Sequence, residues 1–172
     1  MTAILKIHST TAGTLHIGHS WIEYAPIDGD SVTFGTWGNR PTGEGNGLLQ
    51  NVEGDLKPTA TRSSIIDHQQ ELRLFDLINT YKSRGEQAWT LLTPCSTFAS
   101  DAWQQATGER LVHQTAGVST PARLAKAIME ANQRDLHERP PKPAPPAQHG
   151  ADNYSSKPNT PAAPRKKRSR RI

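Results

Sequence analysis

Cys95 is the only cysteine among the 172 residues, and its surroundings favour a reactive thiol. It opens a segment whose apolar residues recur at helical spacing: Phe98, Ala99, Ala102, Trp103 and Ala106. This pattern predicts a helix over 95–107 that ends at Gly108. The start of a helix offers unpaired N–H groups and the positive end of the helix dipole, which favour a thiolate nucleophile. The alternative is that Cys95 is a small apolar residue of the core.

A cysteine nucleophile needs a base, and His19 is the best placed of the seven histidines. It lies in a predicted strand over 14–25, where Leu15, Ile17 and Trp21 share its face. We expect that face to pack against helices, where a polar ring is either paired or functional. The alternative is a core histidine whose hydrogen bonds are satisfied.

The strand register predicts which residue could orient the His19 ring. A strong turn signal at 26–30 predicts a hairpin whose second strand covers 31–37. A three-residue loop would set His19 opposite Asn39, whereas a two-residue loop would set it opposite Gly38. The sequence leaves both registers open.

The remaining segments complete an α+β pattern. Residues 38–61, rich in Gly, Asn, Pro and Thr, predict a long loop, and long loops in compact domains are often functional. A helix is predicted from Asp67, with Gln70 in the capping-box position, and a short strand over 88–92. Thr120 and Pro121 mark the start of a last helix. We therefore expect a small antiparallel sheet packed against helices.

We expect two parts in the chain, a folded body over 1–136 and a tail over 137–172, because composition and charge change near residue 140. Eight of the 20 Lys and Arg residues and eight of the 13 prolines lie at 140–172, beside a single acid, Asp152. The preceding residues keep 12 basic and 15 acidic side chains, so the body is mildly acidic. The tail is too poor in apolar residues to fold alone, and we expect it to be disordered. Its basic cluster predicts contact with anionic surfaces.

Three short motifs resemble one family. These are GHSWI at 18–22, TFGTWG at 33–38 and CSTFA at 95–99. Together they are similar to the circularly permuted branch of the NlpC-type papain-like cysteine hydrolases, in which the His strand precedes the Cys helix. The resemblance covers roughly residues 3–130 and implies a papain-like fold.

The resemblance also implies roles for individual residues. Cys95 would be the nucleophile and His19 the general base. Papain-like sites use a polar residue on the strand beside the histidine, which favours Asn39 as the third catalytic residue. Glu23 shares the face of His19 but lies about 13 Å away along the strand, too far for a direct hydrogen bond. The implied activity is hydrolysis of an amide bond, with peptidoglycan peptides as the expected substrate.

Other expectations follow from the same reading. Bacterial relatives include exported antibacterial toxins, so we expect a neutralising partner protein and export by a specialised secretion system. No apolar run is long enough for a transmembrane helix, and the N-terminus lacks the apolar region of a signal peptide, which predicts synthesis in the cytoplasm. No cofactor is expected, and no residue spacing suggests a metal site.

Two alternatives remain open at the level of sequence. The same fold could carry a thiol acyltransferase or deamidase that acts on a lipid or a protein. The chain could also be a binding module without enzymatic activity, which uses its basic tail on nucleic acid or another anionic surface, with Cys95 as a core residue.

Overall fold

A computed structural model describes residues 2–11, 18–38, 43 and 45–138. The chain divides into two units, Met1–Pro140 and Pro141–Ile172, and the second lies outside the described residues. The structural findings below therefore concern the first unit alone.

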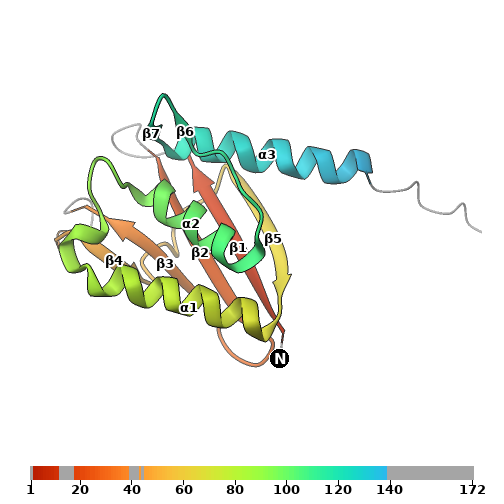
Figure 1. The fold of residues 1–172 in the computed structure, drawn as a ribbon, viewed down its shortest axis with the longest axis horizontal. Coiled ribbons are helices and arrows are strands. Elements are labelled where there is room, and N and C mark those ends of the chain that lie inside the picture. Colours follow the sequence, from red (N-terminus) through yellow and green to blue (C-terminus); the bar gives the residue numbers. More distant parts are fainter. Residues whose placement is uncertain (1, 12–17, 39–42, 44, 139–172) are drawn as a thin grey trace, which may run out of the picture. The chain divides into compact units, whose positions relative to one another are not determined.

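The first unit contains a five-stranded antiparallel sheet in the order β4-β3-β2-β1-β5 (Figure 1). Its strands are β1 (Ala3–Thr10), β2 (His19–Pro26), β3 (Val32–Trp37), β4 (Gly47–Gln50) and β5 (Ala60–Ile66). The first three strands follow one another in sequence and in space, which is the common arrangement for antiparallel strands.

The other elements are mainly helical. They are α1 (His68–Ser83), the 3-10 helix η1 (Gly85–Ala88), α2 (Cys95–Thr107), the short strands β6 (Gln114–Thr115) and β7 (Val118–Ser119), and α3 (Pro121–Glu138). The capping box of α1 is confirmed, because Asp67 accepts from the Gln70 backbone N–H and the Gln70 side chain accepts from the Asp67 backbone N–H. Gly108 ends α2 in the left-handed conformation, as predicted. These elements confirm the α+β class.

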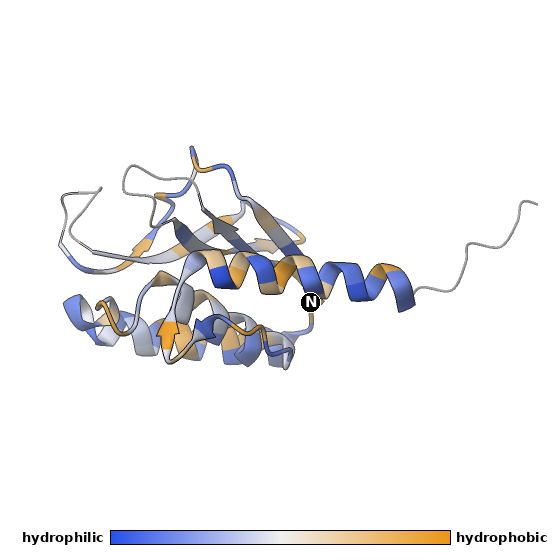
Figure 2. Cartoon of the chain, turned by 90° about the horizontal axis from the view of Figure 1, so that it is seen from above, coloured by the Kyte–Doolittle hydropathy of each residue, from blue (hydrophilic) through white to orange (hydrophobic). Residues whose placement is uncertain are grey.

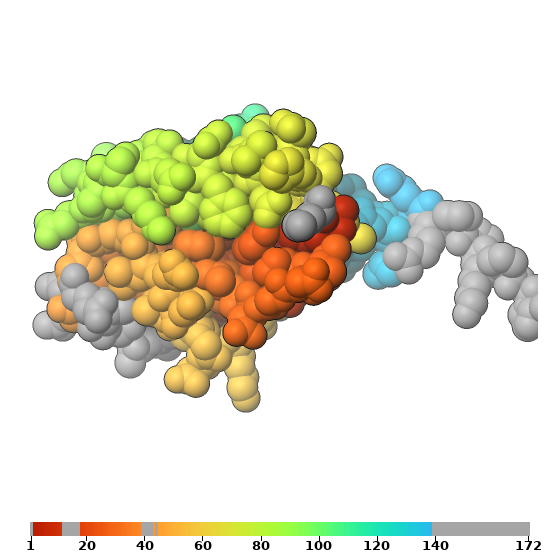
Figure 3. Space-filling view, turned by 90° about the horizontal axis from the view of Figure 1, so that it is seen from below, coloured from red at the N-terminus to blue at the C-terminus, as the bar shows by residue number. Residues whose placement is uncertain are grey.

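The core lies between one face of the sheet and the helices (Figure 2). Both layers contribute fully buried side chains, which include Leu5, Ile7, Ile22, Ile66, Leu74, Phe98, Leu124 and Ile128. Figure 3 shows α1 packed along the strands. On α1, the ring of Phe75 meets the rings of Tyr24 and Phe34 edge-on, with centroid distances of 5.1 and 6.5 Å. No helix among the described residues is long and apolar enough to cross a membrane.

The structure corrects two predicted segments. The loop predicted over 38–61 contains β4 and the start of β5, which are edge strands with too few apolar residues to show an alternating pattern. The strand predicted over 88–92 is instead the end of η1 and a turn, in which Leu91 and Leu92 are 84% and 88% exposed. An apolar run forms a strand only where a neighbouring strand can pair with it.

The face of β2 that meets the helices is also corrected. Ile22 is fully buried in the core, so His19 and Trp21, three residues and one residue away, lie on the opposite face. The prediction relied on Leu15 and Ile17, which precede β2 and lie outside the described residues.

Candidate active site

Cys95 is the first residue of α2, as predicted. Pro94 occupies the N-cap position with an extended backbone, and no side chain among the described residues caps the helix. The thiol is nearly buried, with 6% of the residue exposed. Because the first N–H groups of a helix have no intrahelical partner, the start of α2 can donate hydrogen bonds to a developing oxyanion.

The structure brings His19 and Cys95 together. The Cys95 thiol is close enough to the imidazole to raise the pKa of His19, and Nε2 of the ring donates to Glu53 Oε1 at 3.4 Å. Two tryptophans hold the ring: its centroid is 3.8 Å from that of Trp37 and 5.7 Å from that of Trp21. The imidazole of His19 therefore lies between the Cys95 thiol and the Glu53 carboxylate and interacts with both.

His19 is the first residue of β2 and lies beyond the residues of β2 that pair with β3. Strands β2 and β3 pair only over three residues each, from Ile22 opposite Phe34 to Tyr24 opposite Val32. Extending this register would set His19 opposite Trp37, so both predicted registers, with Asn39 and with Gly38, are wrong. His19 still pairs with Thr10 of β1, and its ring meets Trp37 and interacts with Cys95, the first residue of α2.

Asn39 lies outside the described residues, so its predicted role stays a prediction. Glu23 makes no described contact with His19, in keeping with its distance along the strand. It accepts instead from Lys6 Nζ at 2.8 Å and from His8 Nε2 at 3.1 Å.

Glu53 is the site residue that sequence reasoning missed. It is 2% exposed, and it accepts from Trp37 Nε1 at 2.8 Å and from Thr33 Oγ1 at 2.5 Å, besides His19. Gly35 leaves room for this arrangement, because a Cβ at that position would lie 2.8 Å from His19 Nε2 and closer still to Glu53. No sequence signal distinguished Glu53 from the other acids of the predicted loop.

The site favours the charged forms of His19 and Glu53. Burial alone would lower the pKa of His19, but its contacts with Cys95 and Glu53 outweigh burial and raise that pKa above the usual 6.5. Burial alone would raise the pKa of Glu53, but hydrogen bonds from His19, Thr33 and Trp37 lower it below the usual 4.5. The arrangement therefore stabilises an imidazolium beside a carboxylate, which is the state that follows proton transfer from a thiol.

Neither Ser96 nor Thr97 caps the start of α2. The Ser96 hydroxyl is fully buried and bonds to Ser119 Oγ at 2.6 Å, and Ser119 Oγ bonds to His113 Nδ1 at 2.8 Å. Thr97 Oγ1 is buried without a hydrogen-bond partner among the described residues. A second polar network therefore begins one residue after the cysteine.

Comparison with protein families, with curated proteins and with solved structures finds no match for this chain. Within the described part of the chain, no group of three His, Cys, Asp or Glu side chains is placed to hold a metal ion. The residues that can do chemistry at this site are Cys95, His19 and Glu53.

Proposed function

We propose that this protein is a cysteine hydrolase that cleaves an amide bond, with peptidoglycan peptides as its substrate. The observation that carries the proposal is the contact between Cys95, at the start of α2, and His19, whose ring is held by the buried Glu53. A permuted NlpC-type papain-like fold belongs to the same proposal. It is supported by the order of the His strand before the Cys helix and by an antiparallel sheet packed on that helix.

In the proposed reaction, His19 takes the proton of the Cys95 thiol, and the thiolate attacks the carbonyl carbon of the scissile amide. The backbone N–H of Cys95 donates to the oxyanion of the tetrahedral intermediate. Collapse breaks the C–N bond, and the imidazolium returns its proton to the leaving amine. Water, deprotonated by His19, then hydrolyses the thioester, which releases a carboxylic acid and restores the thiol.

Glu53 is the proposed orienting residue within the described part of the chain. Its carboxylate engages Nε2 of His19, which leaves Nδ1 to exchange a proton with the thiol. A carboxylate in this place fixes the tautomer and the direction of the ring and stabilises the imidazolium. Asn39, the residue favoured by the family resemblance, would have to act in addition to Glu53.

A second candidate function is acyl transfer on a lipid, through the same thioester. It is favoured by the turn at 90–93, which presents Leu91 and Leu92 to solvent directly before Pro94 and Cys95. An acyl chain would cover these side chains, whereas a polar cell-wall peptide would not. In this reaction an amine or hydroxyl group takes the place of water in the second step.

The test compares wild type with Cys95→Ala, His19→Ala and the control His68→Ala, whose histidine side chain is 63% exposed on α1. Each protein is incubated with purified muropeptides and, separately, with phospholipid vesicles, and the products are identified by mass spectrometry. We expect wild type and His68→Ala to cleave the muropeptides. Cys95→Ala should lose all activity, and His19→Ala should lose on the order of 10²-fold or more.

Circular dichroism and thermal unfolding establish that each variant is folded. Full activity of a folded Cys95→Ala protein would refute the mechanism. Modification of lipid without cleavage of muropeptides would select the acyltransferase. Export to the cell wall and a neutralising partner protein remain part of the hydrolase proposal, because an enzyme that cuts the wall would endanger its producer.

A further inference from the structure

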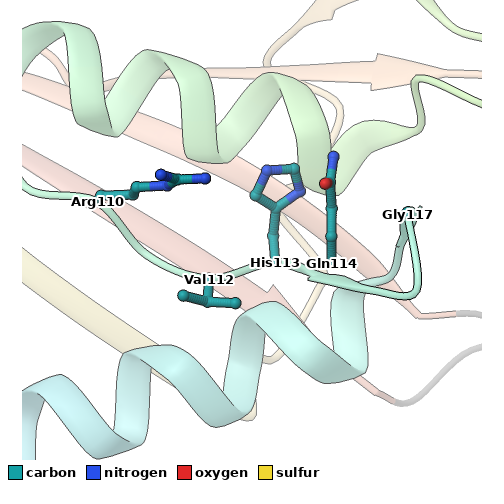
Figure 4. A pocket seen from close by; sticks show the side chains of 5 residues that line it. All are labelled: Arg110, Val112, His113, Gln114 and Gly117. Carbon is teal, nitrogen blue, oxygen red and sulfur yellow. The ribbon is translucent and has the colours of Figure 1, made fainter.

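A surface cavity of about 290 Å³ lies beside the polar network that begins at Ser96. Its lining residues are Arg110, Val112, His113, Gln114 and Gly117. Figure 4 shows the guanidinium of Arg110 and the ring of His113 between their own segment and the neighbouring α2. The polar side chains of the lining can donate hydrogen bonds, and no carboxylate is among them.

Arg110 has no ion-pair partner among the described residues, and its side chain is exposed. Arg62 shows the contrast, since it pairs with Glu109 and Asp135 at 2.7 Å each. An unpaired guanidinium beside a cavity presents a planar fork of donors that fits a carboxylate in two parallel hydrogen bonds.

His113 and Gln114, the other two polar residues that line the cavity, can also donate hydrogen bonds into it. In the tautomer in which Nδ1 of His113 accepts from the Ser119 hydroxyl, Nε2 carries the ring proton and can donate it to a ligand. Burial lowers the pKa of His113, and the charge of Arg110 lowers it further against the opposite effect of Asp101. The ring is therefore neutral at pH 7, and the cavity's fixed charge is that of Arg110. The amide of Gln114 supplies a further donor.

The cavity is joined to the candidate active site by a short chain of contacts. His113, Ser119 and Ser96 are linked by hydrogen bonds of 2.8 and 2.6 Å, and Ser96 directly follows Cys95. The cavity therefore lies on a segment that is hydrogen-bonded to the first turn of α2, the turn that carries the Cys95 thiol. The same hydrogen bonds fix the wall of the cavity relative to the first turn of α2.

We infer that this cavity is a substrate subsite that binds a free carboxylate of the peptide, with Arg110 as the principal contact and His113 and Gln114 as further donors. The inference rests on the proposed function, because it assigns the cavity to the substrate of Cys95. It restricts the substrate to peptides that carry a negative charge near the scissile amide.

The test uses a synthetic peptidoglycan stem tetrapeptide in two forms, with free carboxylates and with every carboxylate converted to a carboxamide. Binding to full-length Cys95→Ala protein is measured by calorimetry, with and without Arg110→Gln. The matched control is Arg134→Gln, which removes the same charge from α3 outside this cavity. We expect the free acid to bind at least tenfold more tightly than the amide, and Arg110→Gln to abolish this difference while Arg134→Gln keeps it.

Equal affinity for the two forms, no binding of either, or an undiminished preference in the Arg110→Gln protein would each overturn the inference. Hydrolysis of the two peptide forms by the wild-type protein is measured as well. It separates failure of the carboxylate subsite from failure of the proposed hydrolase function. Hydrolysis of both forms at equal rates would support a hydrolase without a carboxylate subsite. A binding preference without any hydrolysis would support the subsite and refute the hydrolase.

Discussion

Glu53 is the residue on which the geometry of the site depends. It is buried, ionised and bonded to three donors from two strands: the side chains of His19, Thr33 and Trp37. A buried carboxylate is costly unless such donors satisfy it, and the same donors hold it in one orientation. The direction of the His19 ring thus depends on a residue far from it in sequence.

Replacement of Glu53 by Gln should destabilise the protein by about 1–3 kcal/mol near pH 5.5, because the amide cannot accept from all three donors as a carboxylate does. Ionised Glu53 has a lowered pKa, so its contribution is present above pH 4.5 and is lost as the pH falls through the folded-state value. The raised pKa of His19 adds stability that is present below pH 6.5 and lost as the pH rises through its folded-state value.

Urea unfolding of wild type and Glu53→Gln at pH 3, 5.5 and 8 measures this dependence. The difference between the two proteins should be largest at pH 5.5 and should shrink at pH 3. Glu130→Gln is the control, since its side chain is 45% exposed in an ion pair on α3 and should change stability by less than about 0.5 kcal/mol. A pH-independent difference would contradict the assigned ionisation.

At the scale of elements, β3 determines how closely Glu53 and His19 can approach. The strand presents Trp37 and Thr33 as donors and places Gly35 between them, where a side chain would collide with both partners. Strand β3 therefore contributes to the site in two ways: Thr33 and Trp37 donate hydrogen bonds, and Gly35 leaves the space that His19 and Glu53 occupy.

Gly35→Ala should lower the proposed amidase activity at least tenfold, because the new Cβ displaces the Nε2 of His19 or the carboxylate of Glu53. Gly54→Ala is the matched control, since a Cβ there meets no atom within 4 Å. Activity is measured as kcat/KM on the muropeptide substrate, and folding is verified by thermal unfolding. Equal activity of the two variants would show that the approach of His19 to Glu53 does not matter.

At the scale of the whole molecule, the charge is divided unequally between the two units. Residues 141–172 carry eight basic and one acidic residue, so the net charge of +4 for the chain leaves 1–140 with a formal charge of −3. The excess of positive charge in residues 141–172 predicts non-specific attraction of that segment to anionic surfaces.

Deletion of 141–172 should leave the thermal unfolding of the first unit unchanged, because the core and the candidate site lie within 1–140. The shortened protein should elute from a heparin column at much lower salt than the full chain, because seven net positive charges are removed. Activity on a soluble muropeptide should be retained. Elution of both proteins at the same salt concentration would assign the adhesive surface to the first unit.

The sequence by itself determined the features that depend on neighbours a few residues away. The capping box of α1, the helix over 95–107 with Cys95 at its start and Gly108 at its end, and the strand that carries His19 all follow from local spacing and local hydrogen bonds. Such patterns are complete within one or two turns of chain, and they selected Cys95 as a residue at the start of a helix. The choice of His19 as its partner also depended on the motif resemblance and on a helix-facing surface of the strand, and the structure places His19 on the other face.

The tertiary structure alone decided the register of β2 on β3, the face of β2 that is buried, and the pairing of β4 and β5 with the sheet. These depend on which strand lies alongside, and a shift of one residue moves each side chain to the other face. The same packing brought Glu53 to His19 from a segment that looked like a loop. The identity of the carboxylate in the candidate site was therefore a property of the fold, whereas the thiol and the imidazole could be chosen from the chain.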